Sequence, residues 1–379
     1  MVSNQGGNAS ERKCYIILAS KRYLLILLAV SLSVIVFMVN DPWRTLQYIN
    51  NPAMMNLSIV KEMVEELSSL TTTTTPKATN NHYICPAFVG RAGNQLFIYA
   101  SSFGIARMRD MQIVLNTDCE LLRYFKITEA DIKKDTSFCN SPQVKVIREG
   151  HSAVFDTNVT HFSDGINVRL ATYLQSYLYF DKFTDEIRNQ LTFNDEIRTK
   201  AVSRLETYLQ KYNISRYSTN RIHQYNKKDM YYDFHLTPSV KVTLVGVHIR
   251  RGDWIKEAVY GRLAATKEYF QSAVNWYEAR YKHLVFLVAS NGMDWAKANM
   301  PGNRTIIYLE DHSSPWLDMA TLTLCEHTIE SVGSYSWWVG YLTGGNVTYF
   351  KWPAQEGTRM RKSFSKDYTD HFYPHWVGL

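Results

Sequence analysis

The segment Val245–Asp253 reads Val-Gly-Val-His-Ile-Arg-Arg-Gly-Asp, an apolar run that ends in a histidine, two arginines and a carboxylate. The Val-rich run over 240–247 is typical of a short strand buried in a parallel sheet. Open α/β sheets bind ligands at the carboxyl ends of their strands, where Arg250, Arg251 and Asp253 would lie. Because the fork of an arginine side chain matches phosphate oxygens, the pair favours a diphosphate site. Two alternative interpretations of this segment stay open. It could be a surface loop that contains an ion pair at the end of the strand, or Arg251-Gly252-Asp253 could be an adhesion signal.

The composition indicates a globular protein with ring-lined surfaces. The 379 residues include 25 Tyr, 17 Phe and 9 Trp, which argues against disorder and leaves room for one large domain or two ordinary ones. The formal net charge of +7 is too mild to indicate a nucleic-acid partner. It is compatible with a local basic pocket for an anionic substrate.

The N-terminus predicts a membrane anchor. Residues 23–39 form an uncharged run of 17 residues, which as a helix spans roughly 26 Å, enough for a thin bilayer. Lys21 and Arg22 precede it, so residues 1–22 are expected to form a cytoplasmic tail and the rest of the chain to be lumenal. A cleaved signal peptide is the rival interpretation, although the end of the run lacks small residues. Residues 40–81, which include a threonine run, are expected to form a stem.

Glycosylation sequons and cysteines support a lumenal body. The predicted glycan acceptors are Asn56, Asn158, Asn213, Asn303 and Asn346. Four cysteines follow the anchor and could form two disulfides, and their spacing fits no zinc pattern: Cys85, Cys119, Cys139 and Cys325. Connectivity cannot be deduced from sequence; we favour Cys119 with Cys139 because they bracket a polar loop.

The globular body alternates strands with helices. The predicted strands cover 83–89, 112–115, 240–250, 284–289, 305–309, 325–331 and 347–352. The predicted helices run from Leu96 to Ala106, within 183–212, near 266–281, over 293–299, near 315–323 and over 334–343. This alternation predicts parallel sheets with right-handed crossovers, and hence an α/β protein with two lobes that face each other across a cleft. The expected lobes are 82–240 and 241–353, with a C-terminal extension over 354–379.

A glycine-rich loop, Gly90–Gln95, joins the first predicted strand to the first predicted helix. This architecture points backbone N–H groups and a helix N-terminus at a ligand. The loop lacks both the dinucleotide and the Walker spacings, so neither mechanism is supported. A tight turn with a side-chain cap is the alternative interpretation.

Three blocks of sequence carry a resemblance to a known family. They are Gly90–Ala100, His248–Trp254, and the pair formed by Val288–Trp295 and Cys325–Trp338. In this order they resemble the animal galactoside α-1,2-L-fucosyltransferases, of the glycosyltransferase family 11 type, over roughly residues 83–353. The resemblance implies a GT-B-like fold with two Rossmann-like lobes and the inverting transfer of L-fucose from GDP-β-L-fucose to the 2-hydroxyl of a terminal galactose. It also implies a single-pass type II Golgi membrane protein, with a homodimer as a candidate assembly.

The resemblance implies that no metal is required. The sequence fits this, because we find no Asp-x-Asp dyad that would hold Mn²⁺ or Mg²⁺ against a diphosphate. Arginines would then carry the charge. Arg250 is the predicted critical phosphate contact, and Arg251 takes a more structural share. His248 is predicted to bind the phosphate or orient the loop, or to be a strand-end histidine satisfied by backbone. Asp253 and Glu257 are candidate general bases, and Asp253 could instead lock the arginines.

The resemblance also assigns binding residues on both sides of the cleft. The predicted nucleotide contacts in the C-terminal lobe, besides the arginines, are Ser290, Asn291, Asp294, His327, Ser331, Gly333, Ser334 and Tyr335. The predicted contacts to fucose or acceptor are Gly90, Arg91, Asn94, Gln95 and Trp254. Trp254, Trp337 and Trp338 could stack on sugar, whereas aromatic residues more often belong to a core.

Departures from the family pattern put the acceptor in doubt more than the donor. The segment Trp254–Arg262 differs from the family, Ala92 stands where Leu is common, and Glu326 stands where Asn is common. Two alternatives therefore stay open. One is a fucosyltransferase of α-1,6 or protein O-linked specificity, and the other is a non-catalytic, membrane-anchored lectin or adhesion protein.

Overall fold

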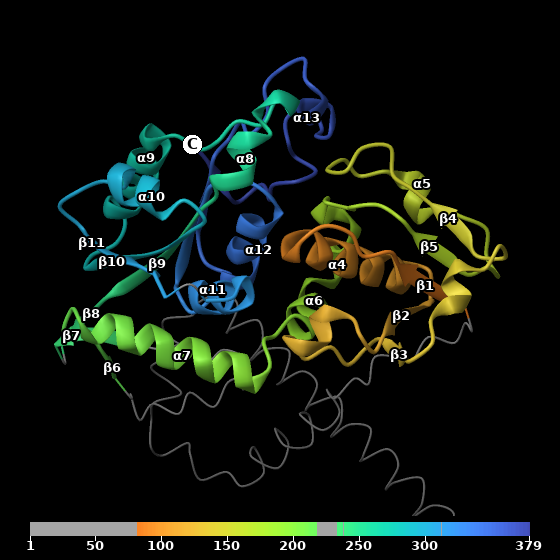
Figure 1. Cartoon of the computed structure of the whole chain (residues 1–379), viewed down its shortest axis with the longest axis horizontal. Coiled ribbons are helices and arrows are strands. Elements are labelled where there is room, and N and C mark those ends of the chain that lie inside the picture. Colours follow the sequence, from red (N-terminus) through yellow and green to blue (C-terminus); the bar gives the residue numbers. More distant parts are fainter. Residues whose placement is uncertain (1–81, 218–232, 238, 312) are drawn as a thin grey trace, which may run out of the picture. The chain divides into compact units, whose positions relative to one another are not determined.

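The computed structural model describes residues 82–217, 233–237, 239–311 and 313–379, whose backbone is organised around two parallel β-sheets (Figure 1). The expected α/β class is therefore confirmed. The predicted anchor over 23–39, the stem over 40–81 and the sequon at Asn56 lie outside the described residues. Within the described part of the chain, none of the helices is both long and apolar enough to cross a membrane.

The first sheet contains five parallel strands in the order β3-β2-β1-β5-β4. The strands are β1 (Tyr83–Pro86), β2 (Gln112–Asn116), β3 (Asp131–Lys133), β4 (Lys145–Ile147) and β5 (Val168–Leu170). Helix α4 (Ala92–Met108) connects β1 to β2, and twelve of its residues are buried. Such a helix, apolar on nearly every side, is expected in the interior of a large protein. Short helices follow: η2 (Glu120–Arg123), η3 (Ser137–Asn140), α5 (Thr157–Thr160), η4 (Tyr177–Tyr179) and η5 (Asp181–Phe183).

Helices α6 (Thr184–Gln190) and α7 (Asp195–Gln210) lead to a small antiparallel sheet of β6 (Ser215–Tyr217), β7 (Asp233–Thr237) and β8 (Val240–Lys241). The single strand predicted over 240–250 is therefore wrong at its start. The buried Val242 donates its backbone N–H to Phe234 at 2.8 Å, which ties the start of this run to β7. The parallel strand begins only at Thr243.

The second sheet contains six parallel strands in the order β11-β10-β9-β12-β13-β14. The strands are β9 (Thr243–Ile249), β10 (Leu284–Ser290), β11 (Thr305–Tyr308), β12 (His327–Glu330), β13 (Val347–Tyr349) and β14 (Val377–Gly378). In chain order this is third, second, first, fourth, fifth, sixth, the doubly wound order of nucleotide-binding sheets. The order in which strands are added to the sheet reverses between β9 and β12, and the carboxyl ends of these two parallel strands therefore mark the expected ligand crevice.

Helices cover both faces of the second sheet. One face packs on α9 (Lys267–Glu278) and α10 (Met293–Asn299), and the other on α11 (Pro315–Leu322) and α12 (Ser334–Thr343). The remaining helices are α8 (Gly252–Lys256), η6 (Ala258–Tyr260) and α13 (Arg359–Lys362). Both faces of the inner strands β9 and β10 are thus buried, which explains why strands such as Leu284–Ser290 are continuous apolar runs.

Helix α12 packs against α4 and joins the hydrophobic cores of the two sheets. The rings of Trp337 and Trp338 lie 4.5 and 5.2 Å from that of Phe97, and both tryptophans are almost completely buried. These two tryptophans therefore belong to the core. Of the rings considered for sugar stacking, only Trp254 lines a cavity.

The C-terminal extension returns to the first lobe. Asp370 accepts a hydrogen bond from the Ser176 hydroxyl through its backbone oxygen, at 2.7 Å, and one from the Phe155 N–H through its carboxylate, at 2.8 Å. The indole N–H of Trp337 donates to the backbone oxygen of His371 at 2.7 Å. The extension thus contacts both lobes.

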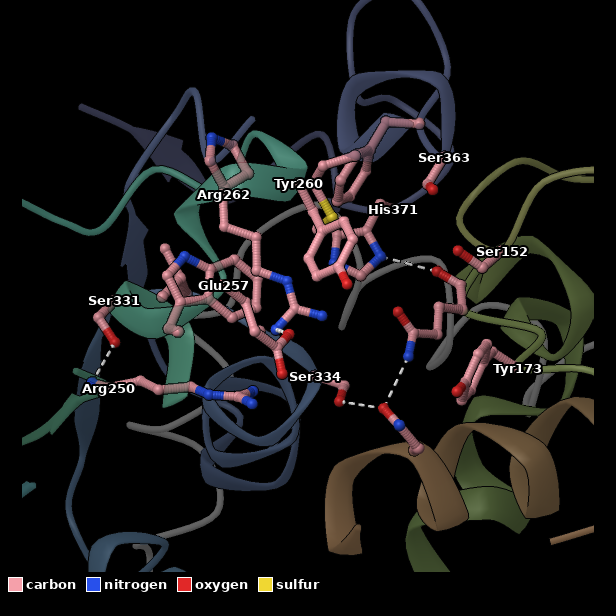
Figure 2. A pocket seen from close by; sticks show the side chains of 18 of the residues that line it. Ser152, Tyr173, Arg250, Glu257, Tyr260, Arg262, Ser331, Ser334, Ser363 and His371 are labelled. Carbon is pink, nitrogen blue, oxygen red and sulfur yellow. Dashed lines mark hydrogen bonds and ion pairs between the residues drawn. The ribbon is translucent and has the colours of Figure 1, made fainter. Parts of the chain in front are cut away.

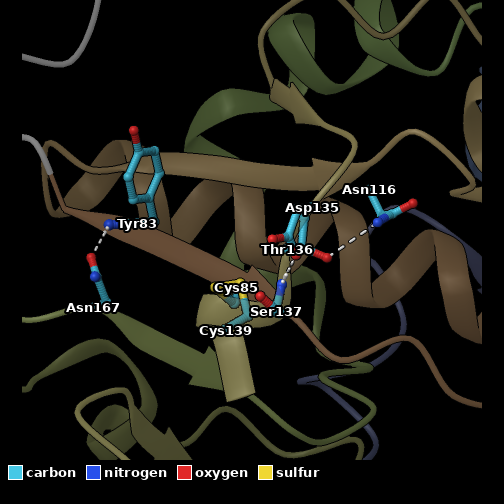
Figure 3. Close-up of a disulfide and its surroundings, with 8 residues drawn as sticks. All are labelled: Tyr83, Cys85, Asn116, Asp135, Thr136, Ser137, Cys139 and Asn167. Atoms are coloured by element: carbon cyan, nitrogen blue, oxygen red, sulfur yellow. Dashed lines mark hydrogen bonds between the residues drawn. A yellow bond between two sulfur atoms is a disulfide. The ribbon is translucent and has the colours of Figure 1, made fainter. Parts of the chain in front are cut away.

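The structure contains a disulfide between Cys85 of β1 and Cys139 of η3 (Figure 3). Their Cα atoms are 5.8 Å apart, within the range that a disulfide spans. The predicted pairing of Cys119 with Cys139 is wrong, because η3 lies over β1 and leaves Cys119, after β2, as a free thiol. Cys325 is also free and buried, so the second disulfide is absent among the described residues. Each described sequon asparagine is exposed, namely Asn158, Asn213, Asn303 and Asn346.

Gly93→Ala is expected to destabilise the protein, although alanine is intrinsically the better helix former. A Cβ atom at Gly93 would lie 2.4 Å from the backbone nitrogen of Tyr335 and 2.5 Å from the carbonyl carbon of Ser334. We expect overpacking to lower the free energy of unfolding by about 1–3 kcal/mol, measured by urea denaturation. Gly302→Ala is the control, because no heavy atom lies within 4 Å of the added Cβ. Equal stability of the two variants would contradict the close contact between α4 and α12.

Candidate functional site

A cavity of about 390 Å³ lies at the carboxyl ends of β9 and β12, the point where the second sheet reverses its strand order (Figure 2). This volume is in the range of ligand pockets in proteins. Residues of the first lobe that line it are Asn94, Ser152, Tyr173 and Gln175. Residues of the second lobe that line it include Arg250, Trp254, Glu257, Tyr260, Arg262, Glu330, Ser331, Gly333 and Ser334, and the C-terminal extension adds Arg359, Met360, Ser363, Phe364, His371 and Phe372.

Arg250 follows the last residue of β9 and lines the cavity. Its backbone N–H donates to the Ser331 hydroxyl at 2.9 Å, which ties the ends of β9 and β12 together. Its guanidinium donates to Asp253 at 2.7 Å and lies 5.0 Å from the Trp254 ring. A Cβ atom on Gly333 would lie 2.5 Å from a guanidinium nitrogen of Arg250, and the φ of Gly333 is +85°. Glycine at 333 therefore makes room for the arginine.

Asp253 is held by two arginines. It forms ion pairs with Arg250 and with Arg91 of the first lobe. Burial alone would raise the pKa of the Asp253 carboxyl, but the hydrogen bonds and charges of Arg250 and then Arg91 outweigh it and lower the pKa to about 2. A carboxylate with so low a pKa is a weak base. The geometry thus favours the interpretation in which Asp253 locks Arg250, and it adds Arg91 as a second partner.

Glu257, the other predicted base, lines the cavity beside Arg262, with which it forms an ion pair. The Trp254 ring lies between two guanidinium groups, 5.0 Å from that of Arg250 and 4.6 Å from that of Arg262. The Trp254 indole N–H donates to the backbone oxygen of Leu263 at 3.0 Å. One wall of the cavity therefore combines an aromatic ring, two guanidinium groups and the carboxylate of Glu257.

His248 does not line the cavity. Burial first, and the positive charge of Arg250 second, lower the pKa of His248 to about 3, so the ring is neutral at physiological pH. Its Nδ1 shares a hydrogen bond with the Ser336 hydroxyl, and its ring lies 4.6 Å from that of Tyr335. The histidine therefore positions the first turn of α12 against β9. The partner of His248 is thus the side chain of Ser336, and not a backbone group as in the alternative interpretation of the sequence.

Arg251 points away from the cavity. Its guanidinium lies 3.9 Å from the Trp295 ring and donates to the backbone oxygen of Ala265 at 3.1 Å. Its backbone N–H donates to the Asn291 side chain at 2.7 Å. Ser290 donates to the backbone oxygen of Ile249 at 2.8 Å. These contacts brace the loops after β9 and β10.

Three other predicted nucleotide contacts also lie outside the cavity lining. Asp294 is exposed in the first turn of α10. His327 begins β12, at the opposite end of the strand from Ser331, and its ring lies 4.3 Å from that of Tyr281. The Tyr335 hydroxyl donates to the backbone oxygen of Pro315, toward α11. The structure thus brings Arg250, Ser331, Gly333 and Ser334 together and leaves these three elsewhere.

The glycine-rich loop meets α12 across the two lobes. The Asn94 side-chain oxygen accepts hydrogen bonds from the Ser334 hydroxyl at 2.6 Å and from the Gln175 amide at 2.8 Å. Gly90, with φ +75°, forms the turn before α4. Gln95 donates instead to Glu120 at 3.2 Å. Asn94 is therefore the member of the loop that lines the cavity.

Sequence reasoning missed the residues that complete the cavity from distant parts of the chain. Tyr173 and Gln175 follow β5, and His371 belongs to the C-terminal extension. His371 shares a hydrogen bond of 2.7 Å with the backbone oxygen of Gln175. Burial lowers the pKa of His371 to about 4, so it too is neutral. The aromatic run over 371–376 was the one signal in the sequence that this extension packs against the body, because an unpacked tail is rarely so rich in rings.

Among the residues that the structure describes, no group of three or more His, Cys, Asp or Glu side chains is arranged to hold a metal ion.

Comparisons with known proteins give one family. The family described as "Glycosyl transferase family 11" matches residues 228–379. Galactoside alpha-(1,2)-fucosyltransferase 1 of Lagothrix lagotricha is 26% identical over 324 residues, which cover 80% of each chain. Galactoside alpha-(1,2)-fucosyltransferase 2 of Gorilla gorilla gorilla is 28% identical over 298 residues, which cover 77% of each chain.

Solved structures to which the chain shows some similarity include a mutant of Arabidopsis thaliana FUT1 in complex with GDP. The TM-score is 0.47 and the identity 11%, and the match covers 77% of this chain and 75% of that one. Another is the fucosyltransferase NodZ from Bradyrhizobium, with a TM-score of 0.42, 11% identity, and coverage of 69% and 92%. The family match and the homology over about three quarters of the chain agree with the motifs of the sequence. Residues 228–379 thus resemble glycosyl transferase family 11, and the chain is a distant homologue of the galactoside α-(1,2)-fucosyltransferases.

Proposed function

We propose that the protein is an inverting galactoside 2-α-L-fucosyltransferase, which moves L-fucose from GDP-β-L-fucose to the 2-hydroxyl of a terminal galactose. The observation that carries the proposal is Arg250, a guanidinium that lines a cavity at the reversal point of a doubly wound sheet. The match of residues 228–379 to the family and the names of the distant relatives support the choice of donor, linkage and acceptor.

Arg250 and the start of α12 are the groups that would stabilise the diphosphate. As the bond between fucose and GDP breaks, negative charge grows on the phosphate, and a fixed guanidinium stabilises that charge. Gly333 and Ser334 begin the ten-residue helix α12, whose N-terminus has no side-chain cap and carries a partial positive charge. Asp253 keeps the Arg250 guanidinium in place.

Glu257 is the better candidate for the base that accepts the proton of the acceptor hydroxyl. It lines the cavity, whereas Asp253 has a pKa near 2 and is bound by two arginines. The first-lobe side of the cavity, with Ser152 and Tyr173, would receive the acceptor sugar. An exposed ring such as that of Tyr173 can stack on the apolar face of a galactose.

The purified protein is expected to release GDP from GDP-fucose when a terminal β-galactoside is present. We expect EDTA to leave the rate unchanged, because arginine takes the place of a divalent cation. Methylation analysis of the product should show a fucose on the 2-hydroxyl of galactose. A 6-linked product or a fucosylated peptide would identify a fucosyltransferase of another linkage. Saturable sugar binding without GDP binding would identify a lectin.

Arg250→Ala is expected to lower kcat/KM by on the order of 10²- to 10³-fold, because one charge-stabilising contact to the reacting phosphate is lost. Steady-state kinetics with GDP-fucose measures the effect. Arg280→Ala is a matched control, since this arginine lies over the Trp276 ring, outside the cavity lining. Its kinetics should stay within about twofold of the parent protein. Near-normal turnover of Arg250→Ala would refute the role of Arg250.

We also propose that residues 23–39 anchor the protein in the Golgi membrane with the body in the lumen. The uncharged run, its basic flank and the exposed sequon asparagines support this location. In cells, the protein should stay in the membrane pellet after alkaline carbonate extraction. It should also shift to lower mass after treatment with an N-glycosidase. Release into the carbonate supernatant would argue for a cleaved signal peptide.

A further inference from the structure

Glu330 is a buried carboxyl group in the cavity that none of the roles above uses. It is the last residue of β12, it is 2% exposed, and it lines the cavity next to Ser331. Its Oε2 atom has no hydrogen-bond partner. Among the described residues no cation forms an ion pair with it, in contrast to Asp253 and Glu257.

The groups around Glu330 come from several elements. The register places it beside His248 of β9 and Tyr349 of β13. The Tyr269 hydroxyl of α9 donates to its backbone oxygen. The other titratable or charged side chains that line the same cavity are Tyr173, Arg250, Glu257, Tyr260, Arg262, Arg359 and His371. His248 and His371 are neutral because burial lowers their pKa values, and burial raises those of Tyr269 and Tyr349, so none of these four supplies a charge near neutral pH.

An unpaired carboxylate in such a place is unfavourable. Removing an ion from water without a partner costs far more than burying the neutral acid. Burial accordingly raises the pKa of the Glu330 carboxyl well above its usual value. A neutral carboxylic acid has one proton that it can donate in a hydrogen bond.

The surroundings also indicate what would accept that proton. Ser331, the next residue, binds the backbone of Arg250, and Gly333 and Ser334 begin α12. A carboxylate here would repel an anion that Arg250 binds, whereas the neutral acid would attract it. We propose that Glu330, in its protonated form, donates a hydrogen bond to the diphosphate of the bound nucleotide. This inference rests on the proposed function, because it requires a nucleotide diphosphate in the cavity.

The test compares the affinity of the full-length protein for GDP in two variants, measured by calorimetry. Glu330→Gln keeps the shape and a hydrogen-bond donor, so we expect affinity within about threefold of the parent protein, and transfer activity should persist. Glu330→Met keeps the volume but removes the donor, and we expect the affinity to fall on the order of 10- to 100-fold. Thermal unfolding of each variant shows whether it folds. If Glu330→Met folds and binds GDP as well as Glu330→Gln, the proposal is overturned.

The pH dependence provides a second readout that a purely structural role would not change. The neutral form of Glu330 does the binding, so GDP affinity of the parent protein should fall as pH rises through the raised pKa of the carboxyl. Glu330→Gln does not titrate and should lose less affinity as the pH rises above about 7, where the terminal phosphate of GDP is already ionised. Parallel profiles for the two proteins would overturn the proposal.

Two further results separate this inference from the proposed function. If the parent protein fails to bind GDP, the proposed function itself fails. If Glu330→Gln binds GDP normally but loses turnover, Glu330 acts as a carboxylate base and the hydrogen-bond proposal is wrong. Glu196→Gln is the matched control, since this carboxylate pairs with Lys200 on the exposed side of α7. It should match the parent protein in both affinity and pH profile.

Discussion

Gly93 lies against the backbone of Ser334 and Tyr335, and the rest of the site depends on this contact between the first turns of α4 and α12. The absence of a side chain at Gly93 lets Asn94 reach both Ser334 and Gln175. The same close approach of α4 and α12 buries Trp337 and Trp338 against Phe97. The helix start that faces the cavity and the core that joins the two sheets are therefore consequences of one close packing.

Helices and strands could be predicted from the sequence wherever the pattern of apolar residues matches the side chains that the structure buries. Helices α10 and α12 lie where they were predicted, over Met293–Asn299 and Ser334–Thr343, and the apolar strand at Leu284–Ser290 extends one residue beyond its prediction. Alternation of such elements leaves few ways to bury both faces of a sheet. The start of β9 was misjudged because a hydrogen bond to Phe234, distant in sequence, decides the sheet to which the chain belongs there.

Much of the site could not be predicted because neighbours in sequence point to different surroundings. Arg250 and Arg251 are equivalent as residue types, yet one lines the cavity and the other covers Trp295. The disulfide partner of Cys139 and the contacts of His371 depend on how distant segments meet, which no local spacing encodes. Loops and extensions converge on the cavity because a scaffold holds them there, and this convergence is a tertiary property.

The charges at the cavity determine how strongly it attracts an anion. Arg250 and Arg91 share the single carboxylate of Asp253, so this cluster carries one net positive charge, whereas Arg262 is balanced by Glu257. Arg91 and Arg359, the second of which also lines the cavity, are exposed and therefore screened by solvent, which leaves Arg250 as the least screened cation. An ionised Glu330 would cancel that charge. The potential near Arg250 therefore stays most positive while the buried carboxyl group is protonated, and the lack of a cationic partner for this group favours that state.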